Sequence, residues 1–382
     1  MKTKTIITVF CLVFMITSCT KSPETIFDED ASGVVLILNK FYYTANIPGR
    51  STMYFTGIDA DTLSDLTFSQ KEIKYNTVFG TGFFVSKYGK IATNRHVASP
   101  PISPAEVKAC FNSQISNFKA EISNQQAYLS AQYSSLYSQL EQNESSYTSD
   151  ENSYSTDDSY SSGDTSSGYE DNGNNEQLKI QLQELRDQYD QLESLKSNLS
   201  TTDVNDMKVS CVPDVKIAYN NTFVSKESDF KECVVTNTSD DDDFDLAIIQ
   251  LKDKKTPESS HVFEISTKEG DGLLNKFSLY DPNKRVKLND KLIMIGYNAG
   301  IDLAQTSQGI KAQLTIGNVS QAPDMYKILY SIPALAGSSG SPVLDEGGNV
   351  VAVNFAGVRN TQSFNFGIPV KALRKLIEDK DE

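Results

Sequence analysis

Apolar residues are arranged in short runs separated by turn-forming residues along most of the chain. Three runs precede residue 100, at 33–38, 51–58 and 81–98. Eight more follow residue 204, at 215–220, 232–237, 245–251, 290–297, 310–320, 326–332, 349–357 and 364–369. Short β-branched strands without intervening helices are typical of a barrel or sandwich. After the last run, one face of a predicted C-terminal helix over 370–380 carries Val370, Leu373, Leu376 and Ile377.

The pattern between the two groups of strands has a helical period. Apolar residues recur at three- and four-residue steps from Pro104 to Gln142 and again from Glu176 to Leu199. The segment 145–175 between them consists of Ser, Asp, Tyr, Gly and Asn with almost no aliphatic residues, so it is predicted to be disordered. Two amphipathic helices with such a tip predict an antiparallel hairpin. The helices either pack on each other, which we favour, or pair with another chain.

The first twenty residues have the pattern of an export signal. Lys2 and Lys4 precede an apolar run from Ile6 to Ile16, which is short of the ~20 residues that span a bilayer. The stretch Ile16–Thr17–Ser18–Cys19 resembles a bacterial lipobox, and this resemblance implies that Cys19 is lipidated and becomes the mature N-terminus. An ordinary cleaved signal is the alternative. Residue 20 is Thr and not Asp, which favours the outer membrane in a cell that has one.

These patterns divide the chain into consecutive parts. We expect a lipoprotein signal peptide at 1–18, a tether at 19–30 and the first part of a β-barrel at 31–101. A helical insertion follows at 102–204, with a disordered tip at about 143–175. The first barrel is completed by 205–258, and 259–382 form a second barrel with the C-terminal helix.

Composition and charge narrow the range of partners. A net charge of −15 over 382 residues opposes binding to nucleic-acid phosphates. The hydrophobic content of 38% is low for a globular protein, as expected if the insertion lies outside a core. Outside the leader the cysteines are Cys110, Cys211 and Cys233. Cys211 can pair with either of the other two, or all three stay as free thiols. Without a CxxC motif or a Cys/His cluster, no metal site or cofactor is predicted.

Three polar residues stand where buried strands meet turns. His96 ends an apolar hairpin, Asp245 begins the strand "DLAIIQL", and Ser339 lies within "GSSGSP". A histidine there is often structural, an acid before a buried strand needs a polar partner, and a Gly/Ser segment is often only a turn. Glycines on both sides of a serine also let the backbone expose its hydroxyl and direct successive N–H groups to one point. Asp240 to Asp243 are interpreted as a solvated loop, because they lack the glycine and distal glutamate of a calcium loop.

Taken together, "TGFFVSKYGKIATNRHVA", "DLAIIQL" and "GSSGSPVLDEGGNVVAV" occur in the order His, Asp, Ser. This ordered set resembles the trypsin-like (chymotrypsin-fold) serine peptidases, especially bacterial Deg-type proteases and glutamyl endopeptidases. "DKLIMIGY", "IGNVS" and "FGIPV" support the resemblance, which covers about 31–100 and 205–379. It implies a mainly β fold of two six-stranded antiparallel barrels.

The resemblance also implies a role for each residue. His96 is the general base, Asp245 orients it and Ser339 is the nucleophile of a serine endopeptidase that forms an acyl-enzyme. The backbone N–H groups of Gly337 and Ser339 form an oxyanion hole. Asn354, Phe355 and Ala356 align a polypeptide substrate as an added strand. The substrate side chain at the cleaved bond is expected to be small or apolar, because Pro333–Ala334 and Ala356–Gly357 carry no charge.

The chain departs from the family in its spacing. His96 and Asp245 are 245 − 96 = 149 positions apart, where the family has a few dozen, and the helical insertion accounts for the excess. Two other readings remain. One is an inactive homologue that only binds peptides, and the other is an envelope protein that binds a partner through its helical insertion.

The lipobox can be tested by substitution. Cys19→Ser should abolish incorporation of radiolabelled palmitate and leave a soluble or unprocessed precursor, because the acylated thiol is lost. The matched control is Cys11→Ser, which removes a cysteine inside the apolar run and should retain label. Equal membrane attachment of the Cys19→Ser chain would contradict lipidation.

Overall fold

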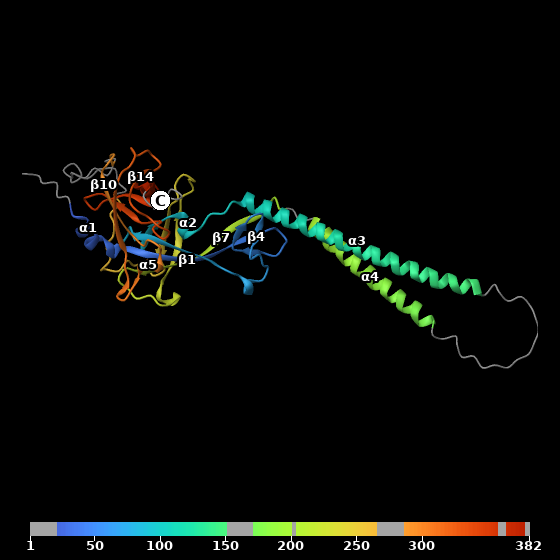
Figure 1. Ribbon diagram of the computed structural model, residues 1–382. Coiled ribbons are helices and arrows are strands. Elements are labelled where there is room, and N and C mark those ends of the chain that lie inside the picture. Colours follow the sequence, from blue (N-terminus) through green and yellow to red (C-terminus); the bar gives the residue numbers. More distant parts are fainter. Residues whose placement is uncertain (1–20, 151–170, 201–203, 266–285, 358–363, 379–382) are drawn as a thin grey trace, which may run out of the picture. The chain divides into compact units, whose positions relative to one another are not determined.

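The computed structural model describes residues 21–150, 171–200, 204–265, 286–357 and 364–378 (Figure 1). The chain forms two compact units. The first comprises Met1–Tyr42, Lys74–Pro101 and Cys211–Glu382, and the second comprises Tyr43–Ile73 and Ile102–Ser210. The predicted signal peptide, Cys19 and the centre of the predicted disordered tip lie outside the described residues.

One antiparallel sheet of the first unit is built from strands on both sides of the insertion in sequence. Its order is β2 (Met53–Phe55), β1 (Val34–Asn46), β5 (Asn76–Phe84), β6 (Lys90–Thr93), β9 (Ala247–Leu251), β8 (Lys231–Thr238) and β7 (Lys208–Tyr219). A further pairing of β1 with β7 closes the last six of these strands into a ring. The last residues of β1, from Tyr43, and the first of β7, to Ser210, belong to the second unit.

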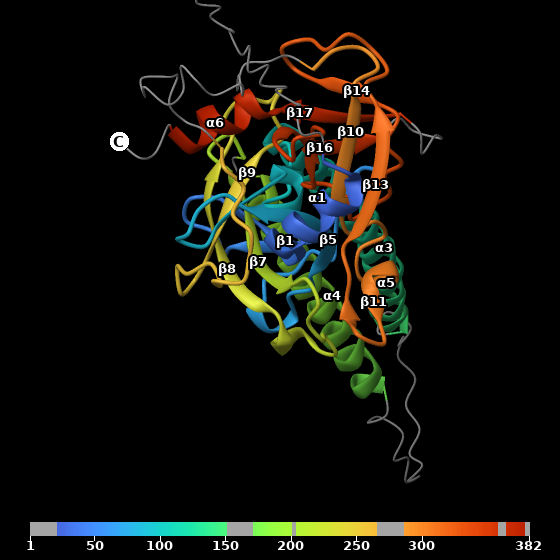
Figure 2. The same ribbon diagram turned by 90° about the vertical axis from the view of Figure 1, so that its left-hand side faces the viewer.

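The other sheet of the first unit also has six antiparallel strands. Its order is β13 (Gln313–Asn318), β10 (Lys291–Gly296), β15 (Pro342–Leu344), β16 (Val350–Gly357), β17 (Asn365–Pro369) and β14 (Ile328–Tyr330), coloured orange to red in Figure 2. A bridge between Val319 and Tyr330 joins its first and last strands. A short helix α5 (Ile301–Ala304) and the small pair β11 (Gln305–Thr306) and β12 (Gly309–Ile310) follow β10. The expected mainly β fold is confirmed, with one closed six-stranded antiparallel barrel and a second six-stranded sheet that forms a half-barrel.

Strand β1 shows why the core forms where it does. Its apolar run has no polar alternation, and both of its faces are buried. Val35 and Ile37 pack with residues of the first sheet, whereas Val34 and Leu36 join a core that also contains Ile293 and other residues of the second sheet. The predicted C-terminal helix α6 (Val370–Glu378) buries Leu373 and Leu376 in the same core.

The expected tether at 19–30 is wrong from Pro23 onward. Helix α1 (Pro23–Asp30) occupies that stretch, with Ser22 as its N-cap and a proline at its start. Ile26 is completely buried in the core shared by the two sheets. The helix has only two turns, so its sequence shows too little periodicity to be recognised.

The second unit contains the predicted helical hairpin. Helices α3 (Pro104–Asp150) and α4 (Asp171–Ser200) are longer than the apolar seams indicated and extend into the predicted disordered tip. They pack on each other, the arrangement we favoured, and bury Ile115, Ile122, Leu129, Leu140 and Leu182. Small strands of this unit are β2 (Met53–Phe55), β3 (Gly57–Asp59) and β4 (Thr62–Ser64). The apolar run 51–58, which we expected in the first barrel, lies in this second unit, where β2 pairs with the end of β1.

Polar contacts set the register of the two helices. Gln126 of α3 is buried, donates to Glu193 at 2.7 Å and accepts from Lys196 at 3.3 Å. Nearer the tip, Asn143 donates to Asn175 at 3.0 Å. These pairs run in opposite directions along the two sequences, so the hairpin is antiparallel, and a buried polar layer of this kind disfavours slipped registers.

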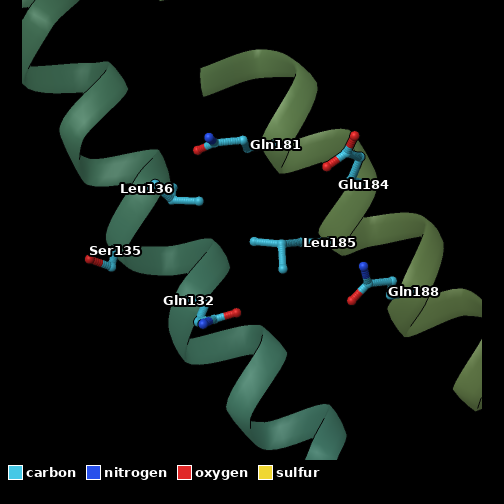
Figure 3. A pocket seen from close by; sticks show the side chains of 7 residues that line it. All are labelled: Gln132, Ser135, Leu136, Gln181, Glu184, Leu185 and Gln188. Carbon is cyan, nitrogen blue, oxygen red and sulfur yellow. The ribbon is translucent and has the colours of Figure 1, made fainter. Parts of the chain in front are cut away.

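A cleft of about 380 Å³ opens between α3 and α4 (Figure 3). Leu136 and Leu185 face each other across it, and five polar side chains surround them: Gln132, Ser135, Gln181, Glu184 and Gln188. None of the helices in the described ranges is both long and apolar enough to cross a membrane.

The burial of Ile26 predicts that α1 is a structural part of the first unit. Ile26→Ala should lower the free energy of unfolding by about 2–5 kcal/mol, measured by urea denaturation. Glu24→Ala, which changes an exposed residue of the same helix, is the control and should have little effect. Equal stabilities of the two variants would show that α1 is not needed for the fold.

Candidate active site

His96 lies on α2 (Arg95–Ala98), a single helical turn that begins directly after β6. Contacts from β1 and from the residue Asp245 hold this turn in place. The side chain of Asn39 in β1 donates to the two carbonyl oxygens at the end of α2, at 2.9 and 3.0 Å. Asn94, which precedes the turn, donates to the backbone carbonyl of Asp245 at 2.8 Å.

Asp245 precedes β9, the neighbour of β6 in the sheet. One carboxylate oxygen accepts from the His96 backbone N–H at 2.9 Å, and the other is hydrogen-bonded to His96 Nδ1. A carboxylate only accepts, so Nδ1 carries the proton and the lone pair of Nε2 is free to act as a base. The sequence placed these residues 149 positions apart, and the structure brings their side chains into contact.

The charge of Asp245 is favoured by its surroundings. Burial raises its pKa, but the hydrogen bond and charge of His96, its backbone N–H and the charge of Arg95 together bring the pKa below the ordinary value. Arg95 is held nearby by Ser239 O and by Asp242, at 3.1 and 3.2 Å. Asp242 is 96% exposed at its side chain, which agrees with a solvated loop at this position.

Ser339 is carried by a glycine turn between β14 and β15. Gly337 and Gly340 have φ values of +97° and +89°, a region that favours glycine. A Cβ on Gly340 would also collide with the carbonyl of Thr81 and the hydroxyl of Thr93. The turn therefore requires glycine on both sides of Ser339, which is half-buried between two buried neighbours.

Thr81 of β5 fixes this turn from the first sheet. Its N–H donates to the Ser339 carbonyl at 2.8 Å, and its hydroxyl donates to the Gly337 carbonyl at 2.8 Å. Its own carbonyl accepts from the hydroxyl of Thr93, the last residue of the strand that leads to His96, at 2.7 Å. Among the hydrogen bonds of the described chain, none joins Ser339 directly to His96, so their connection runs through Thr81.

The backbone N–H groups of Gly337 and Ser339 donate to no protein atom in the described part of the chain. The predicted substrate-aligning residues lie beside them on β16. The Asn354 N–H donates to Ser341 O at 2.9 Å, and the Asn354 carbonyl accepts from Gly340 N at 2.8 Å. Pairing of β16 with β15 ends there, while pairing with β17 continues to Gly357. The β15 side of Phe355 and Ala356 is therefore an open strand edge within the described residues.

Several residues of the site escaped the sequence analysis. The strand β15, which follows the glycine turn, was not predicted, because it is only three residues long. Thr81 carries one weak signal, its position between Gly80 and Gly82 in a buried run. The side chains of Tyr330 and Asn354, which are joined by a hydrogen bond of 2.8 Å, gave no signal for their contact.

The cysteines and the second histidine lie apart from this chemistry. Cys110, Cys211 and Cys233 are all free thiols. Burial raises the pKa of Cys211 to about 11 and that of Cys233 to about 12, so neither is a thiolate at neutral pH. His261 pairs with Asp30 at the end of α1, with 3.5 Å between Nδ1 and Oδ1. No group of three or more His, Cys, Asp or Glu side chains in the described ranges is arranged to hold a metal ion.

Comparison with known proteins finds a family match for part of the chain. Residues 205–353 match the family model described as a trypsin-like peptidase domain, a range that includes Asp245 and Ser339. No curated protein matches the sequence significantly. A similar solved structure is the serine endoprotease from Yersinia pestis, with 12% identity and a TM-score of 0.41. The match covers 94% of this chain and 66% of that one, slightly less than two thirds of its length.

The hydrogen-bonded carboxylate of Asp245 predicts a pH dependence of stability. A carboxyl group whose pKa is lowered on folding stabilises the protein above the pKa of the unfolded chain, near 3.8, and this stabilisation is lost as the pH falls through the folded pKa. Wild type should therefore lose more unfolding free energy than Asp245→Asn between about pH 5 and pH 2.5. Denaturant titrations at several pH values measure this difference.

Asp242→Asn is the matched control, because it removes a carboxylate from the same loop that is almost fully exposed. Its stability should follow the wild-type curve. An Asp245→Asn curve parallel to wild type would show that the pKa of Asp245 is not lowered by folding.

Proposed function

We propose that this chain, which carries a trypsin-like serine peptidase domain, is a serine endopeptidase that cleaves polypeptides through a His96/Asp245/Ser339 triad. The match of residues 205–353 to a trypsin-like peptidase domain supports the serine-type peptidase class. The observation that carries the triad is the hydrogen bond between His96 Nδ1 and Asp245. His96 lies on the turn after β6, and Thr81 connects the last residue of β6 to the Ser339 turn by hydrogen bonds. His96 lies outside the matched range, so its part in the proposal rests on this geometry.

The proposed reaction begins with proton transfer. His96 Nε2 takes the proton of the Ser339 hydroxyl as the oxygen attacks the peptide carbonyl, and the Asp245 carboxylate stabilises the imidazolium that forms. The carbonyl oxygen becomes an oxyanion, and the N–H groups of Gly337 and Ser339 bind it. His96 then gives its proton to the departing amine, which leaves an acyl group on Ser339. Water, activated by His96 in the same way, releases the second product.

The open edge of β16 gives the proposed substrate its position. An extended peptide that pairs with the backbone of Phe355 and Ala356 adds a strand to the sheet, with its carbonyl beside the Ser339 turn. The Asn354 carbonyl accepts one hydrogen bond from Gly340 and has a second lone pair for a substrate N–H. The nearby Ala334 and Ala356 favour a small or apolar side chain at the cleaved bond.

We also propose that the peptidase is anchored in the bacterial cell envelope, with the outer membrane favoured where one exists. The lipobox-like sequence at Cys19 supports this location. The Lys21 N–H donates to Glu346 O of the first unit, so only Thr20 separates the anchor from folded structure. The two steps from Cys19 to Lys21 span at most about 7 Å, and the peptidase would be held close to the bilayer. The α3–α4 hairpin is then available to a protein partner in the envelope.

The triad can be tested by substitution and labelling. A fluorophosphonate should label Ser339 in wild type, and Ser339→Ala, His96→Ala or Asp245→Ala should each lower peptide hydrolysis by about 10⁴- to 10⁶-fold. The losses should not add, because the three residues act as one unit, so Ser339→Ala combined with His96→Ala should be hardly slower than either alone.

Ser341→Ala is the matched control for the nucleophile. The Ser341 hydroxyl is buried and has no hydrogen-bond partner among the described residues, so its loss should be far milder. Wild-type hydrolysis by Ser339→Ala, or labelling of another serine while Ser339 stays free, would refute the triad and favour a peptide-binding homologue without activity.

A further inference from the structure

The side chain of Asn354 is directed into the protein, and both its oxygen and its nitrogen are hydrogen-bonded. It is 2% exposed on β16, and its Nδ2 donates to the Ser338 carbonyl at 3.0 Å and to the Ser338 hydroxyl at 3.2 Å. Its Oδ1 accepts from the hydroxyl of Tyr330 at 2.8 Å. Tyr330 is fully buried on β14. The Ser338 carbonyl can only accept, so the amide orientation is fixed by chemistry as well as by position.

The contact with the Ser338 carbonyl has a consequence for Ser339. The carbonyl of Ser338 and the N–H of Ser339 belong to one planar trans peptide, in which these two groups point in opposite directions. A hydrogen bond that draws the Ser338 oxygen toward the buried Asn354 therefore turns the Ser339 N–H away from the core. Rotation of this peptide would remove the N–H from the position where an oxyanion forms.

Backbone contacts strengthen this control. The Asn354 carbonyl accepts from Gly340 N, and its N–H donates to Ser341 O, both just after Ser339. Together with the side-chain bond to Ser338, just before it, one residue holds the chain on both sides of Ser339. A buried amide whose oxygen and nitrogen are both hydrogen-bonded has little freedom to rotate, since each alternative orientation leaves a polar group unpaired. The peptide is thus set before substrate arrives, which is the condition for effective oxyanion stabilisation.

We infer that Tyr330 and Asn354 are positioning residues that orient the Ser339 N–H of the oxyanion hole through the Ser338 carbonyl. This inference rests on the proposed function of Ser339. It assigns the Asn354 side chain a role apart from substrate alignment. The role differs from that of Asp245, because neither residue touches His96 among the described contacts.

The reaction of the enzyme with a simple alkyl fluorophosphonate tests this role. Ser339 Oγ forms a bond to phosphorus, fluoride leaves, His96 Nε2 takes the hydroxyl proton, and the phosphoryl oxygen occupies the oxyanion hole. The rate is measured against pH for wild type, Asn354→Ala and Tyr330→Phe. Intact mass and peptide mapping identify the labelled serine, and thermal unfolding confirms that each variant is folded.

Asn354→Ala should lower the plateau rate by about 100- to 1000-fold, the loss seen when an oxyanion donor is removed. Tyr330→Phe keeps the Asn354 amide and removes only the hydroxyl that donates to it, so a smaller fall in the plateau rate, of about 10-fold, is expected. The pH midpoint should stay at the wild-type value in both, because the His96–Asp245 pair is untouched. A role in stability alone would lower the unfolding temperature and leave the rate of folded protein unchanged.

Tyr297→Phe is the matched control, because it removes another buried tyrosine hydroxyl, which donates to Val34 O at 3.4 Å. Its plateau rate should stay within about 3-fold of wild type. Wild-type rates in both Asn354→Ala and Tyr330→Phe, a shifted midpoint, or an equal loss in Tyr297→Phe would overturn the inference. Wild type that is unlabelled, or labelled away from Ser339, would instead refute the proposed function itself.

Discussion

The hydrogen bonds of Thr81 join the two sheets of the first unit at the candidate active site. Thr81 is fully buried. Its N–H and its hydroxyl donate to the carbonyls of Ser339 and Gly337, and its own carbonyl accepts from the Thr93 hydroxyl. A base and a nucleophile that come from different sheets need such a connection, because small shifts between reacting groups lower the reaction rate by large factors. The glycine next to Ser339 allows this connection, because the backbone of the turn lies too close to Thr81 for a residue with a Cβ.

The core behind the site makes this connection rigid. Strand β1 buries one face among residues of its own sheet and the other in a core that includes the second sheet. Ile26 of α1 and Leu373 of α6 enter the same core, so elements from both ends of the described chain support it. Close packing of this kind transmits strain and resists sliding of one sheet on the other.

Buried polar networks then give the site its chemistry. Asp245 orients His96 and remains charged although it is partly buried, because His96 and Arg95 outweigh the cost of burial. Tyr330 and Asn354 hold the opposite side of the site by buried hydrogen bonds. One network acts on the His96 imidazole and the other on the backbone around Ser339.

The sequence by itself determined the strand-rich fold, the helical hairpin and the three residues His96, Asp245 and Ser339. Continuous apolar runs and three- and four-residue steps are local signals, and the three residues appeared in a recognisable order beside buried strands. The sequence did not reveal α1, since two turns with one buried apolar residue show no period, nor the place of residues 51–58 in the second unit. Only the tertiary structure decided that Asp245 meets His96 across the long insertion, that Thr81 holds the Ser339 turn, and that Asn354 bonds to Ser338. Each of these contacts joins residues whose positions depend on how strands pair, and pairing between distant strands leaves no local mark in the sequence.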